Sequence, residues 1–380
     1  KTGTHTDDGG SIFTLDDGKY VEANLKGKML SVKKFGAKGD NTSDDTARIQ
    51  AAADYVANDS SGKLGLGFGN SGVYLISQLN TRFSERTIDM TGAVLRPTVE
   101  NQFMWEHHGL LTEWIKGKIE PSGQTPTTEY WGIRVSNDAT TNQSGENSFD
   151  KTYFAGCSRS LEFFMDNAFG ACYRHTLLKV KTAGNSDTLA GSFGIAFKGA
   201  AANDSAGNDS KVISCAIKNS LYNIFSQNSL GLKLSLTYSD GGTNGVWYEG
   251  GSHLDIIGCY LENNNVGLRR VGGADLVKII GGSFSNTTNL VGSAGSGLRD
   301  TIVGVVNLIE SSPSKEVTGG GILKLGWSNG AMIGETDGSL NDAEGLQVDN
   351  SGVTGVQAYP TIGEMVYHLN ASKTINIRTG

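Results

Sequence analysis

The hexapeptide GVWYEG at residues 245–250 recurs along the chain and decides the fold. In every copy the second residue is apolar and the last is Gly or Asn. The further copies are GIRVSN (132–137), EFFMDN (162–167), GIAFKG (194–199), NIFSQN (223–228) and GLRRVG (267–272), and MWEHHG (104–109) precedes them in the same alignment. Repeats every 20–50 residues indicate a solenoid, a propeller or another array.

Short strands, and no helix, fill the space between copies. Segments such as 212–219, 254–263 and 276–286 alternate apolar and polar residues, as half-buried strands do. A propeller blade needs roughly 40 residues and four strands, whereas the spacing here allows two or three strands per repeat. The sequence therefore predicts an all-β fold, a right-handed parallel β-helix. Asn219, Asn263 and Asn286 end these strands and predict an inward asparagine ladder at one corner.

One helix is predicted, at the N-terminal end of the solenoid. It should run over residues 46–57 with Asp44 or Asp45 as its N-cap, and its apolar face consists of Ile49, Ala52, Ala53 and Val56. Such a helix would cap the open end of the stacked strands. We predict an N-terminal arm or neck over residues 1–30, the β-helix with its capping helix over 31–310, and final coils or a β cap over 311–380.

Composition excludes some functions. The chain has 380 residues and a net charge of −7, which argues against nucleic acid as a partner. No apolar run approaches the ~18 residues of a membrane span, so no membrane partner is expected. The four cysteines show no metal spacing, and we expect buried free thiols, with neither a metal nor another cofactor.

The segment before the first repeat resembles a known domain. VKKFGAKGD at 32–40, DDT at 44–46 and IQAA at 49–52 resemble the N-terminal end of the pectate-lyase-like β-helix domain. With the DDGG arm at 7–10 and the coils rich in Asn and Gly, the chain looks most like a phage tailspike that depolymerises capsule or O-antigen.

This resemblance implies a homotrimer at the virion tail that binds a bacterial surface polysaccharide, capsular or O-antigen, and cleaves it by hydrolysis or β-elimination. The catalytic motif sets of polygalacturonases and of calcium pectate lyases are absent from the sequence, so no catalytic residue is carried over.

The hexapeptides also sort side chains into inward and outward positions. Because position two points inward, positions three and five should point outward. Position three reads Glu106, Arg134, Phe164, Ala196, Phe225, Trp247 and Arg269. Position five reads His108, Ser136, Asp166, Lys198, Gln227, Glu249 and Val271.

Three carboxylates on this surface are candidate catalytic groups: Glu106, Asp166 and Glu249. Glu106 and Asp166 would lie two coils apart, roughly 9–10 Å, close to the carboxyl separation of inverting glycosidases. Asp166 and Glu249 would be three coils apart, roughly 14 Å, which is long for an acid and base pair. The leading interpretation is an endo-acting glycoside hydrolase with Glu106 and Asp166 as the pair.

The other outward side chains are candidate substrate-binding groups. Phe164, Phe225 and Trp247 could stack on sugar rings. Arg134, Arg269 and Arg270 could bind the carboxylate of an acidic sugar. In a lyase, His108 or Tyr248 could remove the proton.

Other interpretations stay open. The carboxylates could be merely solvated, and the aromatic residues could pack in a trimer interface. The protein could also be a lyase, a non-catalytic glycan-binding spike, or a secreted enzyme acting on plant polysaccharide.

Overall fold

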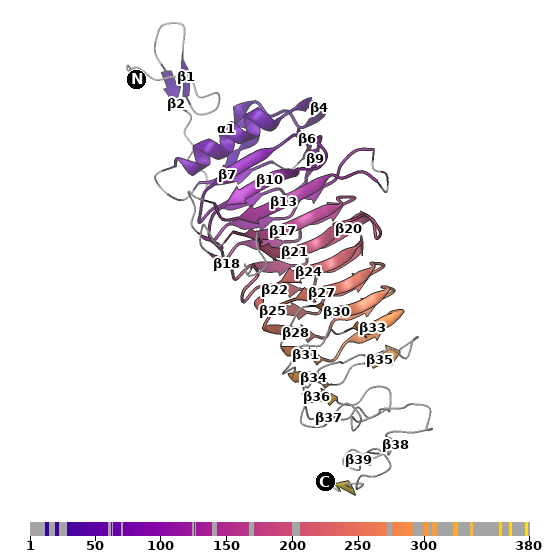
Figure 1. Cartoon of the computed structure of the whole chain (residues 1–380). Helices are drawn as coiled ribbons and strands as arrows, with labels where there is room; N and C mark the ends of the chain where they lie inside the picture. Colours follow the sequence, from indigo (N-terminus) through magenta and orange to yellow (C-terminus); the bar gives the residue numbers. More distant parts are fainter. Residues whose placement is uncertain are drawn as a thin grey trace.

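The protein is a solenoid of short strands stacked in three long sheets (Figure 1). The computed structural model describes residues 29–291, apart from 60–61, 63, 70, 124, 126, 139–142, 167–170, 200–205 and 272–275, and outside that range only short strands. Within the described residues the three sheets have nine, eleven and thirteen strands, paired in parallel except for β36 with β37. The predicted parallel β-helix is confirmed.

Each of the nine complete coils contributes one strand to each sheet. The nine-stranded sheet consists of β7 (Leu79–Arg82), β10 (Phe103–His108), β13 (Trp131–Ser136), β17 (Arg159–Met165), β21 (Phe193–Gly199), β24 (Tyr222–Gln227), β27 (Asn244–Glu249), β30 (Val266–Val271) and β33 (Thr288–Val291). The eleven-stranded sheet consists of β4 (Asp40–Asp44), β6 (Gly72–Ile76), β9 (Ala93–Pro97), β12 (Lys118–Ile119), β16 (Tyr153–Ala155), β20 (Lys181–Ser186), β23 (Ala216–Ser220), β26 (Tyr238–Asp240), β29 (Tyr260–Glu262), β32 (Ser283–Ser285) and β35 (Val306–Ile309).

The remaining long sheet has the most strands. It consists of β3 (Met29–Ser31), β5 (Gly65–Gly67), β8 (Thr87–Asp89), β11 (Glu113–Ile115), β15 (Ser148–Asp150), β19 (Thr176–Leu178), β22 (Lys211–Ile213), β25 (Leu230–Ser235), β28 (His253–Ile257), β31 (Leu276–Ile280), β34 (Arg299–Val303), β36 (Ile322–Leu325) and β37 (Glu335–Thr336). Strands β14 (Gln143–Gly145) and β18 (Ala171–Tyr173) pair beside the coils, in the loops that follow β13 and β17.

The terminal segments lie mostly outside the described residues. β1 (Ile12–Thr14) pairs antiparallel with β2 (Tyr20–Glu22), and β39 (Met365–Val366) lies between β38 (Gln357–Ala358) and β40 (Ile377–Arg378). The predicted arm over 1–30 and the predicted unit over 311–380 therefore stay predictions.

The predicted helix is confirmed as α1 (Thr46–Ala57), with the predicted residues Ile49, Ala52, Ala53 and Val56 buried. It packs against β7 and the short 3-10 helix η1 (Val32–Phe35), over the N-terminal end of the solenoid (Figure 1). The two aspartates have different partners. Asp44 accepts a hydrogen bond from the Thr46 amide at 2.9 Å, and buried Asp45 accepts from the amides of Lys38 and Gly39 at 2.7 and 2.9 Å.

Among the described residues, no helix has the length and apolar character that crossing a membrane requires.

The interior is a continuous apolar column. Position-two residues of successive coils pair in register and are at most 1% exposed: Ile133, Leu161, Ile195, Ile224, Val246 and Leu268. Next to this column, Phe163 stacks on Phe197 at 5.1 Å between ring centroids and on His175 at 4.2 Å. The four cysteines are buried and free, as predicted.

An asparagine ladder exists, but with different members from those predicted. Asn223 donates from Nδ2 to Oδ1 of Asn264 at 3.1 Å, and Asn264 donates to Oδ1 of Asn286 at 2.8 Å. Of the predicted members only Asn286 belongs to it. Asn219 and Asn263 are exposed and have φ values of 56° and 55°, because they form left-handed corners just outside the ladder.

Candidate functional site

The register of β17 differs from the sequence alignment. In the β13–β17 pair, Ile133 lies beside Leu161, Arg134 beside Glu162 and Ser136 beside Phe164. The alignment of EFFMDN was therefore wrong by two residues. Leu161 and Phe163 are both apolar and both buried, so alternation alone fits either choice, and only strand pairing distinguishes them.

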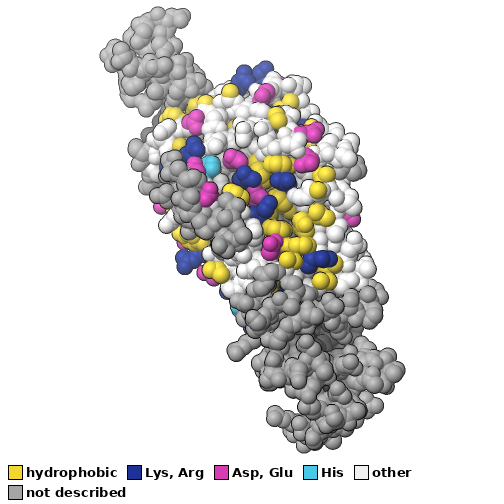
Figure 2. Space-filling model, in the orientation of Figure 1, with side chains coloured by type: hydrophobic (Ala, Val, Ile, Leu, Met, Phe, Trp, Pro, Cys, Tyr) yellow, Lys and Arg dark blue, Asp and Glu magenta, His cyan; other side chains and the backbone are white. Residues whose placement is uncertain are grey.

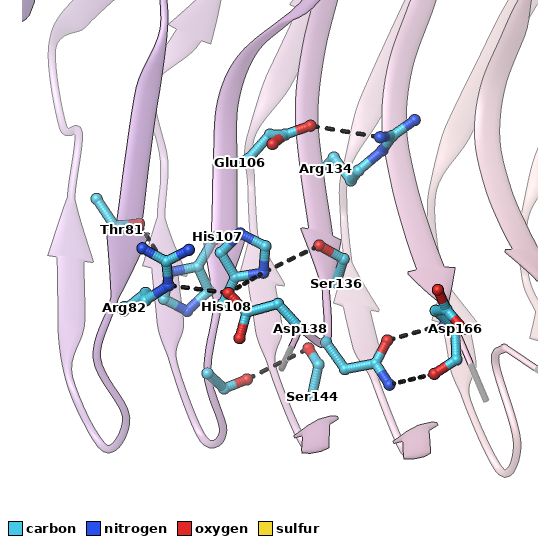
Figure 3. Close-up of polar contacts among 12 residues, drawn as sticks. Thr81, Arg82, Glu106, His107, His108, Arg134, Ser136, Asp138, Ser144 and Asp166 are labelled. Atoms are coloured by element: carbon cyan, nitrogen blue, oxygen red, sulfur yellow. Dashed lines mark hydrogen bonds and ion pairs between the residues drawn. The ribbon is translucent and has the colours of Figure 1, made fainter. Parts of the chain in front are cut away.

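This correction changes the outward positions. Glu162 takes position three, Phe164 moves to position five, and Asp166 follows the end of the strand. Figure 3 shows Asp166 near the loop ends of the strands, where the Asn137 side chain bonds its backbone N–H and C=O at 3.0 and 2.9 Å. Four residues along a strand and two coils separate Glu106 from Asp166, about 16 Å between Cα atoms. The structure does not bring this predicted pair together.

We call the outward surface of the nine-stranded sheet the outer face, and it consists of three rows. Row A is Phe103, Trp131, Arg159, Phe193, Tyr222, Asn244 and Val266. Row B is Glu106, Arg134, Glu162, Ala196, Phe225, Trp247 and Arg269. Row C is His108, Ser136, Phe164, Lys198, Gln227, Glu249 and Val271.

The alternating pattern of the sequence does not predict row A, because strict alternation fails at the start of each strand. Met104 and Trp105 are consecutive, and both belong to the core, whereas Phe103 packs in a separate cluster with Phe193 and Trp131. Glycine marks the irregularity: a Cβ on Gly132 would lie 2.3 Å from the Ser160 carbonyl oxygen. An aromatic residue just before this glycine, as in Trp131-Gly132 and Phe193-Gly194, was the available signal.

Row B holds an ionic cluster. Arg134 Nε contacts Glu162 Oε2 at 2.5 Å, and its Nη1 contacts Glu106 Oε1 at 3.3 Å (Figure 3 shows Arg134 and Glu106). Lys198 Nζ lies 3.8 Å from the other Glu162 oxygen. Glu162 is 1% exposed, while the Glu106 side chain is 24% exposed. Two carboxylates two coils apart, about 9.6 Å between Cα atoms, thus lie on either side of one guanidinium.

His108 lies in row C beside Ser136 and Asp138 (Figure 3). Its Nδ1 is 3.2 Å from Ser136 Oγ and 3.7 Å from Asp138 Oδ2, and Arg82 Nε donates to the same Asp138 oxygen at 2.8 Å. Because Ser136 and Asp138 share one ring nitrogen, the three residues do not form a Ser-His-Asp relay, which needs both nitrogens. Burial lowers the pKa of His108, and Asp138 partly opposes this shift.

Hydrophobic and cationic side chains interleave over the rest of the outer face (Figure 2). The Arg134 guanidinium lies 4.4 Å from the Phe103 ring centroid and 4.8 Å from that of Phe164. Lys198 lies over Phe225 at 5.7 Å. Within an aromatic-rich site such cations present both charge and a flat apolar surface.

Trp247 anchors the C-terminal part of this face. Its ring meets Tyr222 edge-on at 5.1 Å, and its Nε1 donates to Glu249 Oε2 at 3.3 Å. Arg269 lies 5.4 Å from the Trp247 centroid and donates to Asn244 Oδ1 at 3.0 Å. The structure thus brings Trp247, Glu249 and Arg269 together, although in the described residues Arg269 bonds Asn244 rather than Glu249. No group of His, Cys, Asp and Glu that could hold a metal is found in the part of the chain described.

Comparison with known proteins gives structural matches only. No protein-family model matches the chain, and no curated protein matches its sequence. The enzymatically active domain of bacteriophage CBA120 tailspike protein 2 aligns with a TM-score of 0.55 and 11% identity, over 85% of this chain and 46% of that one. The gp42 tailspike of Acinetobacter phage vb_AbaP_AS12 aligns with a TM-score of 0.54 and 13% identity, over 95% and 73%.

The chain has the fold of phage tailspikes. It spans about half the length of the CBA120 tailspike chain. The same fold also occurs in PfbA, a surface adhesin of Streptococcus pneumoniae, with a TM-score of 0.50 and 14% identity over 93% of this chain and 98% of that one. Fold alone therefore does not separate cleavage from binding.

Proposed function

We propose that this chain is the glycan-cleaving part of a phage tailspike. It would act as an endo-depolymerase on a bacterial capsular or O-antigen polysaccharide, at the virion tail and as a homotrimer. The outer face carries this proposal, because its three rows present rings, cations and carboxylates over seven coils. That length, roughly 30 Å, accommodates several consecutive sugar residues.

Hydrolysis is the favoured reaction. Glu106 and Glu162 have the coil separation that was expected of Glu106 and Asp166, so Glu162 replaces Asp166 as the proposed partner. We propose that Glu106, the more exposed group, is the general acid that protonates the leaving oxygen. Glu162 would be the general base that activates the attacking water. Substrate would have to displace Arg134 from Glu162, which frees the guanidinium for a sugar oxygen. Glu249, held by Trp247, is proposed to bind sugar hydroxyls rather than to take part in the chemistry.

β-Elimination is the second candidate, and His108 favours it. Burial lowers the pKa of His108, so the imidazole is neutral at pH 7 and able to accept a proton. In this reaction Arg134 would neutralise the carboxylate of an acidic sugar while His108 removes the adjacent proton.

One experiment tests both reactions. The purified protein is incubated with a panel of capsular and O-antigen polysaccharides, and the products are analysed by mass spectrometry and ultraviolet absorption. Oligosaccharides that have gained water indicate a hydrolase. Products without added water that absorb in the ultraviolet indicate a lyase. Tight binding with no shortening of any bound polymer would contradict cleavage and support a binding spike.

A further inference from the structure

Arg159 lies on the outer face with its guanidinium over an aromatic ring. Its guanidinium carbon is 3.9 Å from the Trp131 ring centroid and 5.9 Å from that of Phe193. Within the described part of the chain it makes no ion pair and no hydrogen bond. The side chain is partly buried. Burial lowers its pKa, and the charges of Glu162 and Glu129 partly oppose this shift. Removing a cation from water is costly unless an anion or a hydrogen-bond acceptor compensates.

Two arginines on or beside the outer face, in contrast, form ion pairs. Arg82 contacts Asp138 at 2.8 Å, and Arg134 contacts both Glu106 and Glu162. The chain has 39 Asp and Glu residues against 32 Lys and Arg, so a shortage of carboxylates does not explain the missing ion pair. Unlike Arg82 and Arg134, Arg159 makes no ion pair with any described residue.

Arg269 repeats the arrangement farther along. It lies over the Trp247 ring, and among described residues its only hydrogen-bond acceptor is the neutral Asn244 side chain. Arg159 and Arg269 are on β17 and β30, four coils apart, which corresponds to about 19 Å along the solenoid axis. The surface between them carries Tyr222 and Phe225, whose rings contact each other at 5.4 Å.

Trp131 supports a recognition role for the first pair. Its indole Nε1 is buried and has no acceptor among the described residues, whereas buried tryptophan N–H groups usually find one. Its contribution at this position is therefore the ring face on which Arg159 lies. A guanidinium stacked in this way is held in a fixed plane, which suits bidentate contact with a planar carboxylate.

We propose that the outer face binds an acidic polysaccharide, and that Arg159 on Trp131 and Arg269 on Trp247 form two subsites for carboxylate-bearing sugars. The aromatic residues between the two subsites would contact the intervening sugar rings. This inference rests on the proposed glycan-binding role of the outer face, but it is independent of whether the protein cleaves.

The test uses the whole chain and an array of purified bacterial capsular and O-antigen polysaccharides, some acidic and some neutral. We expect the bound members to carry carboxylates. The carboxylates of the tightest-binding polymer are then reduced to alcohols, which leaves phosphate groups intact, and binding of both forms is measured. Reduction should weaken binding at least ~10-fold, the loss of about one charge-assisted contact.

Variants assign that loss to the two arginines. Arg159→Gln and Arg269→Gln should each weaken binding of the native polymer ~10-fold, and Arg159→Lys should recover part of it because charge remains without the fork. The reduced polymer should bind Arg159→Gln within about threefold of wild type, since the shared contact is already absent. Lys233→Gln, on the thirteen-stranded sheet, is the charge control and should change nothing. Unchanged melting temperatures establish that each variant folds.

The outcomes separate this inference from the proposed function. Binding or cleavage of neutral polysaccharides alone would overturn the acidic subsites and leave the depolymerase standing. Tight binding of an acidic polymer that persists after carboxyl reduction would also overturn them, and would point to phosphate where the polymer carries it. Carboxylate-dependent binding without cleavage would support the subsites and contradict the depolymerase.

Discussion

The two faces of the nine-stranded sheet treat polar groups differently, and consecutive histidines on β10 show how. His107 points into the core, is fully buried and is bonded by the neutral hydroxyls of Thr81 and Thr112, both at 2.9 Å. His108 points outward and lies beside Ser136 and the ionised cluster of Asp138 and Arg82. On β10 the inner histidine is therefore enclosed among neutral partners, whereas the outer histidine lies beside charged groups. Changes inside should therefore affect stability, and changes outside should affect function.

The largest expected effect is loss of stability in acid. Burial lowers the pKa of both His107 and His175 to about 3, below the ordinary value of 6.5. Between these values the unfolded chain binds protons that the native state does not, so stability falls as the pH falls from about 6.5 towards 3. Together the two residues should remove on the order of 5 kcal/mol between pH 7 and pH 4.

Denaturant unfolding across this pH range measures the acid effect. The double variant His107→Gln, His175→Gln should have a flatter pH dependence, although it is less stable at pH 7. A pH dependence as steep as that of wild type would show that other groups cause the acid sensitivity.

A second test compares adjacent phenylalanines on opposite faces. Phe163→Ala should lower the free energy of unfolding by about 3–5 kcal/mol, because its ring is fully buried among Phe149, Phe197 and His175. Phe164→Ala, on the outer face, should cost less stability and should weaken glycan binding. Equal stability losses from the two variants would contradict the distinction between faces.

Next in size are the carboxylates of row B. Glu106→Gln should reduce the rate of polysaccharide cleavage at least ~10²-fold, about 2.7 kcal/mol, without lowering the melting temperature appreciably. Asp166→Asn should stay within about threefold of wild type, because its backbone position lies far from Glu106. Asp240→Asn on the eleven-stranded sheet is the matched control and should leave the cleavage rate unchanged. A large loss in Asp166→Asn with normal turnover in Glu106→Gln would restore the pairing expected from sequence.

The smallest effect concerns Trp247 and its neighbour. Trp247→Ala should weaken polysaccharide binding roughly 10-fold, about 1.4 kcal/mol, through loss of a stacking surface. Tyr248→Phe removes the inward hydrogen bond to the Ser229 carbonyl and should cost about 1 kcal/mol of stability while glycan affinity is retained. Isothermal titration of both variants measures polysaccharide affinity, and thermal unfolding of the same samples measures stability.

Much of the fold was predictable because its signals are local and repeated. The repeated hexapeptides predicted the coils of the β-helix. The apolar spacing within residues 46–57 predicted the bounds of α1 and its buried face. The β17 register was not predictable, since Leu161 and Phe163 satisfy the alternation equally well and the choice depends on contacts with β13 and β21. Because of this one ambiguity, the sequence alignment placed Phe164 at position three, where the structure has Glu162.

The site itself was predictable only where alternation holds. Glu106, Arg134, Trp247 and Arg269 lie on the outer face as expected. Arg159 and Trp131 escaped detection because two consecutive residues turn inward just after their row, and a period of two cannot represent that irregularity.

The one-residue-per-coil construction of the outer face has an evolutionary consequence. Each coil adds one side chain to each row and leaves neighbouring coils paired as before, so duplication or deletion of a coil such as Leu230 to Glu249 changes the face in steps of about 4.8 Å. A tailspike lineage could follow changes in a host's polysaccharide repeat by gaining or losing whole coils, without inventing a new pocket.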